Sequence, residues 1–233
     1  MSDKHLSTQF DAELSGISTR VLEMGGLVEM QVAQSVLALT TNSSEIAAVV
    51  LQNEERVNAM EVEIDRDLSS IIARRQPTAR DLRLLIAISK TIANLERVGD
   101  EAARIARTVQ RLIDSGVSSR LPMSDLAFEA ELATALLRKA LDAFARLDVH
   151  RALEVLKQDD QIDKEFDGLL RKLITYMMED PRTISTAIDL VFVAKAIERV
   201  GDHAKNLAEV IIYVVKGTDV RHNSPEAVDA MVR

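Results

Sequence analysis

The sequence predicts an all-α protein that consists of two tandem three-helix bundles related by an internal repeat. The 233-residue chain holds 3% aromatic residues, 8 Gly and 4 Pro, too few for the strands and turns of a β-sandwich or barrel. Apolar residues recur at three- and four-residue steps, which is the period of an amphipathic helix. The order of two long helices, a proline turn and another long helix also occurs twice.

The first half contains three predicted helices. The first covers about residues 6–41, and the second covers about 45–74 with Ser44 as its candidate N-cap. After a proline turn, Thr78 with an Asp three residues later resembles a capping box and starts a third helix, which runs to about Ile113. The apolar stripe of this third helix comprises Leu85, Ile88, Ile92, Leu95, Gly99, Ala102, Ala106 and Val109.

The second half repeats this pattern. Its predicted N-caps are Ser124, Asp148 and Asp180, and Pro181 follows the last of them at the first helical position. Gly217 is expected to close the final helix. The three predicted helices cover about residues 124–147, 148–178 and 180–216.

These boundaries predict two domains. The first bundle covers residues 1–117, a polar linker with Ser and Pro covers 118–123, and the second bundle covers 124–217. The tail, residues 218–233, shows little periodicity, and we expect it to fray.

A five-residue string strengthens the repeat. Glu-Arg-Val-Gly-Asp occurs at residues 96–100 and again at 198–202, inside the third helix of each half. A Gly inside a helix costs about 1 kcal/mol relative to Ala. Its appearance at Gly99 and Gly201 therefore predicts that another helix approaches closely at both positions.

Composition and motifs exclude several classes of function. The net charge of −8 argues against a nucleic-acid-binding surface, and the absence of Cys excludes disulfides, thiolate zinc sites and Cys catalysis. The sequence lacks a glycine-rich phosphate loop and the Gly-x-Ser-x-Gly and His-Glu-x-x-His motifs. No apolar run approaches the roughly 20 residues of a membrane span. The N-terminus lacks the pattern of a secretion signal, so we expect a cytoplasmic protein.

Paired carboxylates are the candidate functional groups. Glu96 lies four residues before Asp100, which places both side chains on the same side of a helix. Such clusters favour hard metal ions such as Mg²⁺, Mn²⁺, Ca²⁺ or iron, although a solvated edge neutralised by Arg is the alternative. The second bundle is the better candidate, because Asn58 stands in the first where the second has an acid. The predicted metal ligands are Glu54, Glu96, Asp100, Asp159, Asp163, Glu198 and Asp202.

One His lies next to this cluster. His203 follows Asp202 directly and points about 100° away from it on a helix. We therefore expect His203 to be a surface residue or the partner of an Asp and not a ligand.

The repeats resemble the PhoU family, the accessory regulators of phosphate-specific transport. Besides the two Glu-Arg-Val-Gly-Asp strings, the resemblance rests on the segments 73–77, 81–83, 176–182 and 217–222. It covers roughly residues 5 to 222, which is nearly the whole chain.

The resemblance implies a fold and a function. The family fold is two similar three-helix bundles, and some members carry metal clusters on Glu/Asp-x-x-x-Asp motifs. The ions expected are divalent or trivalent, namely iron, manganese, magnesium or zinc, and no organic cofactor is expected. The resemblance also implies a non-enzymatic negative regulator of the phosphate-starvation response. It would act as a homodimer or higher oligomer between the ATPase subunit of a phosphate ABC transporter and a sensor histidine kinase, and reach the membrane only through these partners.

Two other functions stay open at this point. One is a ferritin-like, carboxylate-bridged di-metal oxidase, which requires Glu-x-x-His pairs inside a four-helix bundle. Glu96 and Glu198 are each followed three residues later by Gly, so those His ligands are missing. The other is a metal-free helical spacer.

Overall fold

The computed structural model describes residues 8–114 and 122–232, and in this part of the chain it contains helices and no strand. Each half contributes three long helices, and a short 3-10 helix, η1 (Pro181–Thr183), precedes the last of them. The helices are α1 (Thr8–Thr41), α2 (Ser44–Arg75), α3 (Ala79–Asp114), α4 (Met123–Arg146), α5 (Val149–Glu179), α6 (Ile184–Lys216) and α7 (Pro225–Val232). None of the helices in these residues has the length and apolarity to cross a bilayer.

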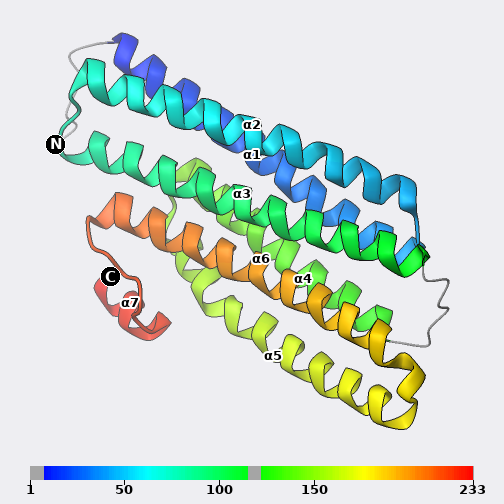
Figure 1. Cartoon of the computed structure of the whole chain (residues 1–233). Coiled ribbons are helices and arrows are strands. Elements are labelled where there is room, and N and C mark those ends of the chain that lie inside the picture. The colour runs from blue at the N-terminus through cyan, green and yellow to red at the C-terminus, as the bar shows by residue number, and fades with distance from the viewer. Residues whose placement is uncertain (1–7, 115–121, 233) are drawn as a thin grey trace.

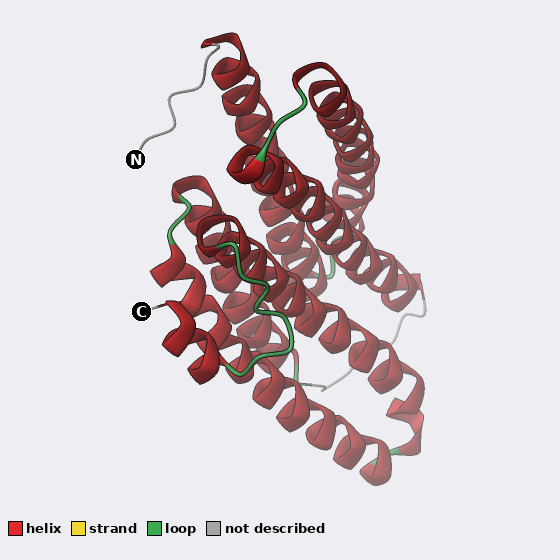
Figure 2. Cartoon of the chain, turned by 90° about the vertical axis from the view of Figure 1, so that its left-hand side faces the viewer, coloured by secondary structure: helices red, strands yellow, loops and turns green. Residues whose placement is uncertain are grey.

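Two three-helix bundles lie side by side, as the sequence predicts (Figure 1). The first consists of α1, α2 and α3, and the second of α4, α5 and α6. The bundles meet along α3 and α6, which run antiparallel, and along α1 and α4. A view turned by 90° shows that the described part of the chain consists of helices joined by loops (Figure 2). Among the six long helices, the outer helices α2 and α5 pack chiefly against the helices of their own bundle.

One apolar core runs through both bundles. Every predicted stripe position of α3 is buried, and the core continues without interruption into α4, α5 and α6. At roughly 25 cal/mol per Å² of buried apolar surface, this shared core is the main stabilising contribution to the fold. The two bundles are therefore packed against each other by the same side chains that stabilise each of them.

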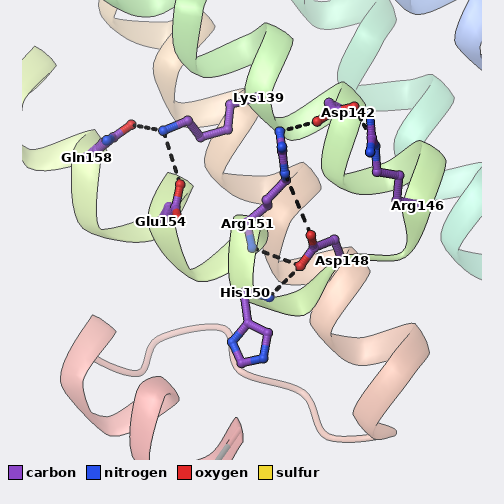
Figure 3. A network of polar contacts seen from close by, with 8 residues as sticks. All are labelled: Lys139, Asp142, Arg146, Asp148, His150, Arg151, Glu154 and Gln158. Atoms are coloured by element: carbon purple, nitrogen blue, oxygen red, sulfur yellow. Dashed lines mark hydrogen bonds and ion pairs between the residues drawn. The ribbon is translucent and has the colours of Figure 1, made fainter.

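The turn between α4 and α5 confirms one predicted cap. The Asp148 carboxylate accepts backbone N–H groups of His150 and Arg151 at 3.0 and 3.1 Å, which satisfies two donors at the start of α5 (Figure 3). Beside the turn, Lys139 of α4 donates to Gln158 of α5 at 3.0 Å. These contacts fix the angle at which α5 leaves α4.

Two other predicted caps are wrong. Ser43, and not Ser44, accepts the backbone N–H of Ile46 at 3.3 Å and caps α2. Ser44 is already the first residue of that helix. At α4 the N-cap is Pro122, without a capping side chain, so Ser124 lies inside the first turn.

The end of the chain differs from the expectation of a frayed tail. Gly217 closes α6 with a φ of 74°, as predicted. After it, Val220 is buried and α7 packs against α5, with Val228 also buried. Lys157 of α5 donates to Asp229 of α7 at 3.0 Å. Helix α7 is difficult to predict from the sequence, because it is short and only two of its side chains are buried.

Candidate functional site

The two Glu-Arg-Val-Gly-Asp strings lie at the middle of the seam between α3 and α6. Each glycine faces its own bundle, as the helix spacing predicts. A Cβ on Gly99 would lie 3.4 Å from Val57 Cγ1 of α2, and a Cβ on Gly201 would lie 2.8 Å from Ile162 Cδ1 of α5. The missing side chains allow α2 and α5 to approach, and they bring the acidic residues of neighbouring helices together.

The second bundle gathers four predicted ligands from α5 and α6. Partial burial raises the pKa of Asp163 and that of Asp202, and the neighbouring carboxylate of Asp159 adds to both shifts. Partial burial also raises the pKa of Glu198. One of these carboxylates is neutralised within the protein, because Lys205 Nζ lies 2.6 Å from Asp159 Oδ2 and forms an ion pair with it.

The first bundle forms a looser cluster. Partial burial raises the pKa of Glu96, and the Asp100 carboxylate adds to the shift. Arg97 lies 3.5 Å from Glu96 and 3.8 Å from Asp100. Both carboxylate oxygens of Glu54 accept from Arg107 at 2.7 Å, so this predicted ligand is engaged in an ion pair.

Neither cluster is a preformed metal centre. In the described residues, 8–114 and 122–232, no three His, Asp or Glu side chains are arranged to hold an ion. Lys205 and Arg107 form ion pairs with Asp159 and Glu54, which are two of the predicted ligands. Metal binding by the predicted ligands therefore stays a prediction.

Sequence reasoning missed two acidic residues beside the first cluster. Glu61 and Asp65 lie four residues apart on α2, and burial together with the Asp65 carboxylate raises the pKa of Glu61. The Glu61 carboxylate in turn contributes to the raised pKa of Glu96. The same i, i+4 spacing that marked Glu96 and Asp100 could have identified this pair.

A third missed group lies inside the second bundle. Glu129 of α4 is 0% exposed, and neither carboxylate oxygen has a hydrogen-bond partner among the described residues. Burial raises the pKa of Glu129 to about 8, with further contributions from Glu198 and Glu165. It therefore holds a proton at neutral pH.

Polar contacts join the two repeats across the seam. The buried carboxylate of Glu101 on α3 accepts from Arg199 of α6 at 3.2 Å and lies 2.9 Å from Arg104 of α3. Asn94 Oδ1 lies 2.9 Å from His203 Nδ1 and accepts from Asn206 at 3.1 Å.

The structure gives His203 a hydrogen-bond partner that the sequence did not predict, the side chain of Asn94. The His203 ring is partly buried against α3, where Asn94 is its hydrogen-bond partner. Burial lowers the pKa of His203 to about 4, and the nearby cations Arg97 and Arg199 add to this shift.

The two strings line a single hollow of about 460 Å³. Because α3 and α6 run antiparallel, equivalent residues of the two repeats face the same space. The lining includes Arg97, Asp100, Glu101, Arg104, Arg199, Asp202, His203 and Asn206.

Comparison with known proteins identifies the family. A profile of the PhoU domain matches residues 21–109 and again residues 128–211, one copy for each bundle. The chain belongs to the PhoU family. The two PhoU domains coincide with the two observed bundles, and each includes one of the Glu-Arg-Val-Gly-Asp strings.

Individual PhoU proteins agree over almost the whole length. A phosphate-specific transport system accessory protein PhoU homolog of Burkholderia sp is 51% identical over 227 residues, which is 97% of both chains. The crystal structure of PhoU from Pseudomonas aeruginosa is 44% identical, with a TM-score of 0.86 over 90% of this chain and all of that one. The phosphate transport system regulatory protein PhoU from Streptococcus pneumoniae is 26% identical, with a TM-score of 0.83 over 91% of this chain and 99% of that one.

Proposed function

We propose that this chain is a cytoplasmic negative regulator of phosphate uptake and of the phosphate-starvation response. It acts as a non-enzymatic adaptor between the ATPase subunit of a phosphate ABC transporter and a sensor histidine kinase. The observation that carries this proposal is the match to PhoU accessory proteins over 97% of both chains, which extends across both bundles.

An exposed apolar stripe supports the role of an adaptor. Ile184, Ile188 and Phe192 follow each other at four-residue steps on α6, and their exposed fractions are 41%, 44% and 56%. Side chains at this spacing form one face of a helix, which is a common mode of contact with a partner protein. We further propose that the chain forms a homodimer, for which the same stripe is the candidate contact surface.

Gene deletion tests the proposal. A strain that lacks the gene should express its phosphate-starvation phosphatase in phosphate-rich medium, because the kinase is no longer restrained. Restoring the gene should return expression to the repressed level. Unchanged expression in the deletion strain would contradict the proposed function.

A variant of the stripe tests the adaptor mechanism. Phe192→Glu places a charge in the exposed stripe without touching the core, so the protein should fold but fail to restore repression. Val62→Glu is the matched control, because Val62 is 67% exposed on the outer helix α2, away from the stripe. If both variants restore repression equally, the stripe is not part of the surface that contacts the partner.

We further propose that the carboxylates of the second bundle bind a hard cation such as Mn²⁺, Mg²⁺ or iron. Partial burial raises the pKa of Asp163, Glu198 and Asp202, and the charges of neighbouring carboxylates add to each shift. A bound cation would offset both effects, which supports the proposal. Elemental composition of protein purified without chelators provides the test. Equal metal content in the wild type and in a variant with Ala at 159, 163, 198 and 202 would contradict it.

The ferritin-like oxidase remains the less supported alternative. Glu129 does place a carboxylate inside the second bundle, but the sequence contains no Glu-x-x-His pair. Oxygen- or peroxide-dependent turnover by iron-loaded protein would favour it over the adaptor.

A further inference from the structure

The hollow between α3 and α6 offers hydrogen-bond donors that the protein itself leaves unused. Among the described residues, Arg97 makes only ion-pair contacts of 3.5 and 3.8 Å. Arg104 and Arg199 each direct a single terminal nitrogen to the shared carboxylate of Glu101. Since a guanidinium group carries five N–H donors, most of the donors of these three arginines remain available.

The same hollow also contains unused acceptors. Asp100 and Asp202 line it, one from each repeat. Asp100 has Arg97 at 3.8 Å, and Asp202 has no hydrogen bond or ion pair with any of the described side chains. With Glu101, the carboxylates equal the three arginines in number, so the hollow has no net charge. A ligand that only accepts hydrogen bonds would be attracted by the arginines and repelled by the aspartates.

We propose that this hollow binds inorganic phosphate that still carries a proton. The guanidinium groups of Arg97, Arg104 and Arg199 donate to its unprotonated oxygens, and in the protein without a bound metal ion Asp100 or Asp202 accepts its P–OH group. Hydrogen phosphate is both acceptor and donor, which matches a lining that mixes guanidinium groups with carboxylates.

This chemistry separates phosphate from its analogues. Sulfate has the same shape and carries no proton at neutral pH, so it would leave the aspartates facing negative oxygens. A phosphate monoester loses its last proton with a pKa of about 6 and is largely unprotonated at pH 7.5. Sites that hydrogen-bond a ligand hydroxyl discriminate strongly against analogues that lack it. We therefore expect inorganic phosphate to bind better than either analogue.

Titration of the purified full-length protein tests the inference. Chelator-treated protein is titrated at pH 7.5 with phosphate, sulfate or glycerol phosphate at constant ionic strength, and backbone amide resonances are recorded. Phosphate should saturate shifts of α3 and α6 amides, and the two analogues should bind at least about tenfold more weakly. Binding that appears only after a divalent metal is added would overturn the inference, because the ligand would then be held by the metal.

Matched variants assign the binding to the hollow. Arg97→Gln should weaken phosphate binding by about tenfold, which is the loss of one charged hydrogen bond. Arg146→Gln is the control, since Arg146 has nearly the same exposure, 65% against 66%, and pairs with Asp142 outside the hollow. Unchanged affinity in a folded Arg97→Gln protein, or equal loss in both variants, would overturn the inference.

A second variant tests the acceptors through selectivity and not through affinity alone. Replacing Asp100 and Asp202 by Asn removes the repulsion of sulfate, so the preference for phosphate over sulfate should fall by about tenfold or more. An unchanged preference would overturn the assigned role of the aspartates. These measurements use pure protein, so their outcome is independent of whether the chain regulates transport.

Discussion

A Cβ placed on Gly201 would lie 2.8 Å from Cδ1 of Ile162, whereas a Cβ on Gly99 would lie 3.4 Å from its nearest neighbours, Gln31 Oε1 and Val57 Cγ1. The repeated glycine is therefore more tightly enclosed in the second bundle than in the first. Ile162 is itself buried, so its side chain has little room to move. This contact sets how closely α5 and α6 approach each other beside the acidic cluster.

Gly201→Ala should destabilise the protein relative to Gly168→Ala. Both changes gain about 1 kcal/mol of helix propensity, but only Gly201→Ala forces an additional methyl group into Ile162, since the space beside Gly168 is open. The expected difference is about 1–3 kcal/mol, the usual cost of overpacking. Urea unfolding of the two variants measures it, and identical stability would show that α5 can move away freely.

Glu129→Gln should remove a pH dependence from the stability of the protein. The native state keeps a proton on Glu129 up to about pH 8, whereas the unfolded chain releases it near the ordinary glutamate pKa of about 4.3. The stability contributed by this proton is complete below about pH 4.3, falls as the pH rises through this window, and is lost above about pH 8.

Melting temperatures from pH 5 to pH 9 check this prediction. The melting temperature of the wild type should fall by several degrees relative to that of Glu129→Gln as the pH rises to 8. Above pH 8 the difference between the two melting temperatures should stay constant. Both variants keep Glu165 and Glu198, the two acids that face position 129, so the difference reports Glu129. Parallel curves for the two proteins would contradict a buried neutral carboxyl group.

Asp148→Ala should cost about 1 kcal/mol, because two backbone N–H groups at the start of α5 lose their acceptor. Ser124→Ala should cost much less, since Ser124 lies inside the first turn of α4 and does not cap it. Chemical denaturation of the two variants compares them directly. A larger loss for Ser124→Ala would mean that the cap of α4 is misplaced.

Lys205→Met should increase metal binding by the second bundle. The Lys205 ammonium lies 2.6 Å from Asp159 and competes with any ion for that carboxylate. Removing it should tighten Mn²⁺ binding by about tenfold, which corresponds to about 1.4 kcal/mol. Calorimetric titration with Mn²⁺ measures the change.

Lys164→Met is the control for this variant. Lys164 lies 3.7 Å from Asp160, and both side chains are exposed to solvent, so the pair contributes little and its loss should leave Mn²⁺ binding unchanged. If neither variant binds Mn²⁺, the acidic residues of this bundle are not metal ligands.

The helices and the core could be predicted from the sequence because each long helix buries a continuous stripe. The α3 positions from Leu85 to Val109 are buried as the three- and four-residue steps predict. Capping was harder to predict, because Ser43 and Ser44 are chemically identical and only the backbone conformation selects Ser43. The short helix α7 was missed because eight residues contain too little periodicity to distinguish a helix from a turn.

The spacing of the predicted acidic ligands along each helix could be predicted from the sequence, and their cationic partners only in part. Glu198 and Asp202 lie on one helix, so their spacing follows from helical geometry alone. Lys195 lies three residues before Glu198 and Arg97 three residues before Asp100, so these two cations follow from helical spacing. Lys205, in contrast, reaches Asp159 across 46 residues, and Arg107 reaches Glu54 across 53, and no local pattern connects these positions. The buried Glu129 was also missed, although it lies three residues after Leu126 and four before Ala133, which is the spacing of the buried stripe of α4.

Because α3 and α6 pack antiparallel, neither half of the chain can form the hollow without the other half. One wall of the hollow comes from residues before 115 and the other from residues after 122, so a polypeptide cut between α3 and α4 would give two fragments with one wall each. Reassociation of such fragments would have to restore a shared apolar core and an arginine-lined space in the same step.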